Sequence, residues 1–86
     1  MIKAHINVYN SKGAKVGAAT HTFADIAAIV DIVMMHYNQH CDCIIDFANG
    51  EHMSPTLARM SYVENYFGAA ALRKEIFVAV AEKSGE

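Results

Sequence analysis

The chain has 86 residues, of which 53% are hydrophobic and 19% are charged, and its formal net charge is -2. This apolar share is too high for a disordered segment, and the length predicts one domain around one packed core. Nothing in the chain resembles the clustered Lys and Arg of a phosphate-binding surface, so we expect no nucleic-acid partner.

The first predicted element is a strand over residues 2–9, where apolar and polar side chains alternate strictly. Residues 10–13 follow as a turn, and Gly13 can take the positive φ that a short hairpin loop requires. Lys15 to about Thr20 should then pair back as a second strand. This segment carries few large side chains, which indicates a strand at the edge of the sheet.

The first helix is predicted from Phe23 to about Asn38. Thr22 and Asp25 match the spacing of a capping box, in which both side chains bind free N–H groups at a helix start. One face of this helix is apolar, as a core-facing helix requires, but the opposite face is apolar too. We therefore expect a partner surface on that outer face. Its residues are Ala28, Ile32 and Met35.

A third strand is expected over residues 41–48, and Asn49-Gly50 is a strong hairpin signal that predicts a brief return strand over residues 51–53. Ser54 and Pro55 then read as the N-cap and first residue of a second helix. Gly68 is a plausible stop for this helix, with an extension through Ala69–Leu72 left open. Its predicted buried stripe consists of Leu57, Met60, Val63 and Phe67.

The last predicted element is a strand over residues 75–81, a nearly continuous apolar run of the kind found in buried strands. Residues 82–86 would form a polar tail behind a single domain of residues 1–81. The expected order is β-β-α-β-(β)-α-β. It predicts an α+β fold with a mostly antiparallel sheet of four to five strands and two helices packed on one face.

The sequence contains no charged segment followed by an apolar leader, and no apolar run of membrane-spanning length. Cys41 and Cys43 are separated by one residue, which in a strand places their Cα atoms about 6.6 Å or more apart and disfavours a disulfide. The sequence thus predicts a cytoplasmic protein with reduced thiols and no membrane contact.

A cluster of soft metal ligands follows the first helix: His36, His40, Cys41 and Cys43. Imidazoles and thiolates are the ligands that zinc prefers, so a metal-binding domain is one hypothesis. The spacing differs from that of the familiar zinc modules. The competing interpretation is that both cysteines continue the inward row of the third strand as small core residues, with no cofactor.

His21 precedes the predicted helix start, where free N–H groups can bind an anion beside a nucleophilic nitrogen. The segment Ala19-Thr20-His21-Thr22-Phe23-Ala24 resembles the phosphocarrier family of the sugar phosphotransferase system in its His-Thr pair and helix start. The resemblance implies a phosphoryl-accepting role for His21. Phe23 stands where that family has an arginine, and the family's terminal helix has no counterpart after Glu82.

No convergent set of ionisable residues, nucleophile turn or glycine-rich phosphate loop is present, so we expect no catalysis. Arg59, Tyr62 and Tyr66 share one flank of the second helix, and such residues are enriched in protein interfaces. The leading hypothesis is a non-catalytic interaction module. It would act as a small regulator or inhibitor, of the size that phages and mobile elements encode, which binds a partner protein or forms a homodimer.

Overall fold

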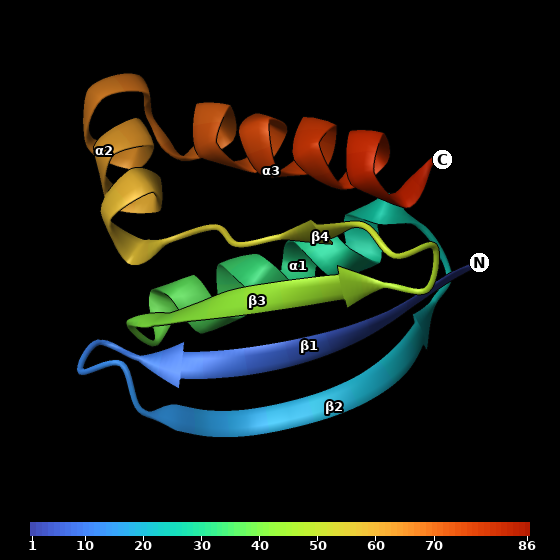
Figure 1. Cartoon of the computed structure of the whole chain (residues 1–86). Helices are drawn as coiled ribbons and strands as arrows, with labels where there is room; N and C mark the ends of the chain where they lie inside the picture. Colours follow the sequence, from blue (N-terminus) through green and yellow to red (C-terminus); the bar gives the residue numbers. More distant parts are fainter.

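The computed structural model describes all 86 residues (Figure 1), and the α+β class that the sequence predicted is confirmed. It contains a four-stranded sheet and three helices. In chain order these are β1 (Ile2–Asn10), β2 (Lys15–Phe23), α1 (Ile26–Asn38), β3 (Cys41–Phe47), β4 (His52–Met53), α2 (Leu57–Phe67) and α3 (Ala69–Ser84).

The sheet has the strand order β2-β1-β3-β4, and every neighbouring pair is antiparallel. β1 is therefore central, and the chain crosses over it through α1 to pass from β2 to β3. One edge is the two-residue β4, and the other is the nine-residue β2. The edge position predicted for the second strand is confirmed, although the strand continues to Phe23 rather than ending near Thr20.

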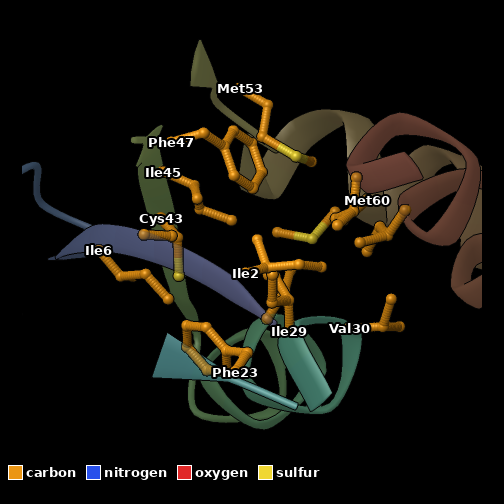
Figure 2. Close-up of a cluster of buried hydrophobic side chains, with 14 of the residues drawn as sticks. Ile2, Ile6, Phe23, Ile29, Val30, Cys43, Ile45, Phe47, Met53 and Met60 are labelled. Atoms are coloured by element: carbon orange, nitrogen blue, oxygen red, sulfur yellow. The ribbon is translucent and has the colours of Figure 1, made fainter. Parts of the chain in front are cut away.

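The core lies between one face of the sheet and the helices (Figure 2). Every second side chain of β1 and β3 points inward, because successive strand residues point to opposite faces. The register between β1 and β3 places Ile6 opposite Ile45 and Val8 opposite Cys43. The buried residues of these strands are Ile2, Ala4, Ile6, Val8, Cys43, Ile45 and Phe47.

The first helix begins three residues later than predicted. Asp25 is its N-cap, and the Asp25 carboxylate accepts a hydrogen bond from the Ala28 N–H at 2.9 Å. Thr22 and Phe23 instead belong to β2, because the Phe23 ring is buried and its backbone pairs with Ile2. Burial of a large aromatic side chain in the sheet therefore outweighs the local capping pattern.

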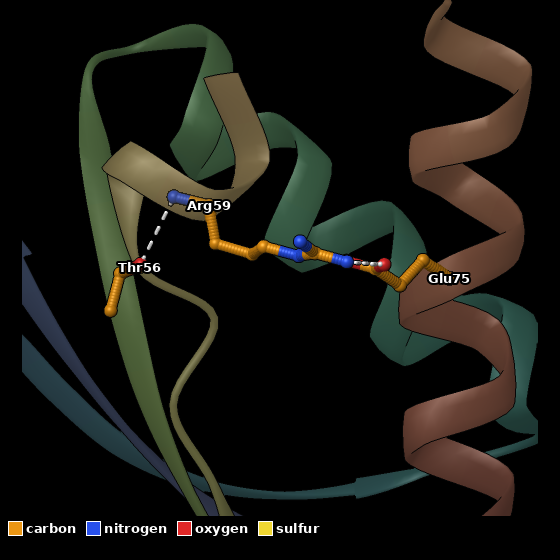
Figure 3. Close-up of polar contacts among 3 residues, drawn as sticks. All are labelled: Thr56, Arg59 and Glu75. Carbon is orange, nitrogen blue, oxygen red and sulfur yellow. Dashed lines mark hydrogen bonds and ion pairs between the residues drawn. The ribbon is translucent and has the colours of Figure 1, made fainter. Parts of the chain in front are cut away.

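The second helix also starts later than predicted. Thr56, not Ser54, is the N-cap, and its hydroxyl accepts a hydrogen bond from the Arg59 N–H at 3.1 Å (Figure 3). Met60 and Val63 are buried as expected. Phe67 was predicted to be buried but is 66% exposed, because it lies in the last turn before Gly68, where α2 projects beyond the core.

The predicted strand over residues 75–81 is wrong, because these residues lie within α3. The buried residues Leu72, Ile76 and Val80 are spaced by four, which is a helical stripe, whereas Phe77 and Val78 are exposed. The apolar run is embedded in alanines and charged residues that favour helix, and these carry the helix on to Ser84. The domain therefore has three helices, and Glu82–Ser84, expected in a polar tail, are helical.

The helices gather on the buried side of the sheet. α1 packs against β3 and α3, and α3 packs in turn against α2 and β4. Figure 1 shows α2 at one end of the molecule and both termini at the other. Met1 and Glu86 line the same surface hollow at that end. None of the three helices combines the length and the apolar character that crossing a membrane requires.

Candidate functional site

A cluster of exposed aromatic rings covers the outer side of α2. Tyr62, Tyr66 and Phe67 are 48%, 73% and 66% exposed. Ring centroids lie 4.9 Å apart for Tyr62 and Tyr66, and 6.2 Å apart for Tyr62 and Phe67 in an edge-to-face contact. These three residues together with Arg59 are called the aromatic patch below. Sequence reasoning found Arg59, Tyr62 and Tyr66 from their helical spacing but missed Phe67.

Arg59 is held in a fixed orientation at the margin of the aromatic patch. Its Nε donates to Glu75 Oε2 at 3.1 Å, and its second guanidinium nitrogen donates to Glu75 Oε1 at 2.6 Å (Figure 3). This hydrogen bonding and the charge of Glu75 raise the pKa of Arg59. The guanidinium carbon also lies 5.6 Å from the centroid of the Tyr62 ring. A bidentate pair of this kind preorganises the arginine, so binding would cost it little rotamer entropy.

The outer face of α1 forms a second candidate surface. Met35 is 45% exposed, whereas Ala28 and Ile32 are half-buried. Ile32 and Met35, with His36, form one wall of a hollow of about 290 Å³, and residues of β1 and β2 form the other wall. Part of this face is thus closer to the sheet than the sequence predicted, and the apolar surface continues from the helix onto the edge strand.

The structure does not bring the predicted zinc ligands together. Cys43 is buried in the core, and Cys41 is half-buried, with its thiol donating to the Gln39 carbonyl at 3.6 Å. His36 faces the hollow beside β2, and His40 lies in the turn after α1, near α2. No three His, Cys, Asp or Glu side chains are grouped to hold a metal ion. The zinc hypothesis stays a prediction that this geometry does not favour.

The two thiols should react at very different rates. Burial, followed by the charges of Asp42 and Cys41, raises the pKa of Cys43 from 9.0 to about 12. At pH 8 only about one Cys43 in ten thousand would be a thiolate, the reactive form. With Ellman's reagent at pH 8, we expect Cys41 to react quickly and Cys43 only as the protein unfolds. Cys41→Ser should remove the fast phase, and a fast phase that persists would contradict the assignment.

His21 lies within β2, four residues before the N-cap of α1, and not at the helix start. Its exposed ring contacts Phe23 edge-on, with centroids 5.7 Å apart, and faces the hollow beside Met35. The N-cap position itself is occupied by the carboxylate of Asp25, whose charge opposes an anion there. The placement expected for an anion or phosphoryl site is therefore not found, although the reactivity of His21 stays a separate hypothesis.

The outward face of the sheet is polar. His5 Nδ1 and Thr20 Oγ1 lie 2.7 Å apart across β1 and β2, and Asp46 is opposite His5 on β3. Such a hydroxyl–imidazole pair could serve as nucleophile and base, but Asp46 forms neither a hydrogen bond nor an ion pair with His5 to orient it. Register also places Asp42 opposite Tyr9. Both aspartates therefore belong to strand positions of this face, and their charge opposes phosphate binding.

Neither known protein families, nor characterised proteins, nor solved structures provide a match to this chain.

Proposed function

We propose that this domain is a non-catalytic interaction module whose aromatic patch docks on a partner protein. The observation that supports the proposal is the exposure of three adjacent aromatic rings beside an arginine already fixed by Glu75. Tyr and Arg dominate the residues that contribute most to protein binding, because they combine large contact area with polar tips. By covering a surface of its partner, the domain would act as a small regulator or inhibitor.

The shape of the aromatic patch favours protein binding over binding of a small molecule. The rings project from a helix surface, and they do not line any of the larger hollows of the domain, whereas small-molecule sites are concave. Projecting rings of this kind fit a shallow depression on another protein. The proposal includes a reducing, cytoplasmic setting, consistent with the two unpaired thiols.

Photo-crosslinking from the aromatic patch tests this proposal in the cells that make the protein. Benzoylphenylalanine at position 66 should yield one crosslinked species of discrete mass, since Tyr66 would lie within the interface. The same amino acid at position 12, in the exposed turn between β1 and β2, should not yield it. Arg59→Ala should weaken the interaction about tenfold or more, the range of an interface residue that contributes strongly.

Two results would count against the aromatic patch as the binding site. One is a set of heterogeneous crosslinks that is the same from positions 66 and 12. The other is a discrete species whose yield Arg59→Ala leaves unchanged while circular dichroism shows a folded protein. Lys74→Ala, on the exposed surface of α3, is the matched control for removing a positive charge.

A further inference from the structure

β2 leaves one full edge of the sheet unpaired. It is nine residues long and hydrogen-bonds only to β1, so alternate N–H and C=O groups along its other side have no strand partner. The opposite edge is protected differently, because β4 has only two residues and packs against α3. β2 is therefore the one long edge that can accept another strand.

Most of β2 lacks the features by which proteins block edge pairing. Lys15 and a register shift opposite Tyr9 lie at its start, but from Gly17 to Phe23 there is no charged residue and no proline, and the pairing with β1 is regular. The helix layer does not cover this strand either. Gly17, Ala19 and His21 point to the helix side of the sheet, opposite the buried Val8, Ile6 and Ala4, yet all three remain at least partly exposed.

We infer that a second copy of this chain pairs antiparallel with β2, so that two sheets join into one of eight strands. Pairing in full register places a two-fold axis at Ala19, the middle of Lys15–Phe23. Gly17 of each copy then faces His21 of the other on the helix side. The imidazole fills space that glycine leaves empty, and the hollow bounded by Ile32 and Met35 closes between the copies.

The strand is complementary to itself, which is why a second copy is the expected occupant. Ala18 meets Thr20 on the outward face and Ala19 meets its own copy at the axis, whereas Lys15 and Phe23 lie at the ends of the pairing on opposite faces of the sheet, so no two like charges are opposed. A nine-residue strand is roughly 30 Å long, and one sheet plus one helix layer is roughly 20 Å high, giving roughly 600 Å² per copy. That area lies at the lower end of specific interfaces, so we expect a dissociation constant in the micromolar range.

Sedimentation equilibrium over a wide range of protein concentration tests the dimer. Ala19→Lys places two like charges at the two-fold axis and should weaken association at least about tenfold. Val78→Lys, on the exposed side of α3, is the matched control and should leave the dissociation constant within about twofold. Circular dichroism should show that both variants fold, since both positions are exposed in the monomer.

Hydrogen exchange on the unmodified protein is a second test that needs no variant. Amides of β2 that point away from β1 should become more protected as protein concentration rises, whereas those of the turn at residues 11–14 should not change. A monomer at millimolar concentration, or a dimer that Ala19→Lys does not weaken, would overturn the inference. The aromatic patch lies on α2, so these results are independent of the proposed function.

Discussion

Leu72→Ala should lower the free energy of unfolding by about 2–5 kcal/mol, the range for truncating a fully buried leucine. Leu72 has no exposed surface and lies where α3 packs against the rest of the core. The truncation removes hydrophobic burial and leaves a cavity that the rigid neighbours only partly fill. Urea unfolding followed by circular dichroism measures the change, with the m-value showing whether the transition stays two-state.

A matched pair of valines shows whether the C-terminal residues form a helix. In a helix Val80 shares the buried stripe with Leu72 and Ile76, whereas Val78 lies outside it and is 45% exposed. A strand would instead place Val78 and Val80 on the same face. Val80→Ala should thus cost about 2 kcal/mol and Val78→Ala no more than about 0.5 kcal/mol. Equal losses of stability from both substitutions would contradict the assignment of these residues to a helix.

Gly68→Ala should destabilise the domain by about 1–3 kcal/mol, because only glycine tolerates the backbone conformation there. Gly68 has φ of 94° and ψ of 166°, and it is the single residue between α2 and α3. A Cβ at this position would meet no neighbouring atom within 4 Å. The loss would therefore come from backbone strain and not from a side-chain clash, and thermal or urea unfolding measures it.

The control for this strain is Gly17→Ala. Gly17 has no positive φ, and a Cβ at this position would also have free space around it. Alanine should change stability there by less than about 1 kcal/mol, in the favourable direction through lower entropy of the unfolded chain. Stability should be measured at low protein concentration, so that association through β2 does not contribute to the difference between the two variants. If both substitutions change the free energy of unfolding equally, backbone strain at position 68 is not the cause of the loss.

The sequence predicted the sheet well because its signals are local. Alternation over residues 2–9 and the turns at Gly13 and Asn49-Gly50 indicate the first strand and the two hairpins without any knowledge of the rest of the chain. The last helix was missed for the opposite reason. A short apolar run looks the same in a strand and in a helix. Only the packing of Leu72, Ile76 and Val80 as one buried stripe shows that this run is a helix.

The candidate surfaces were only partly predictable. Spacing along α2 identified Tyr62 and Tyr66, because helix periodicity alone places residues four apart on one face. It could not show that Phe67 is exposed, since that depends on where the core ends, nor that Glu75 fixes Arg59 from another helix. The few large side chains of β2 did predict its edge position, but the full strand order, which leaves the two-residue β4 at the other edge, is not determined by local sequence.

The position of the chain ends makes this domain suitable as an insert. Met1 and Glu86 line one hollow, so the domain could be inserted into a single surface loop of a host protein with little strain at the two connections. In Figure 1 the α2 end lies opposite both termini. In a fusion through the termini, Tyr66 and Phe67 would therefore lie on the side of the domain that faces away from the host protein.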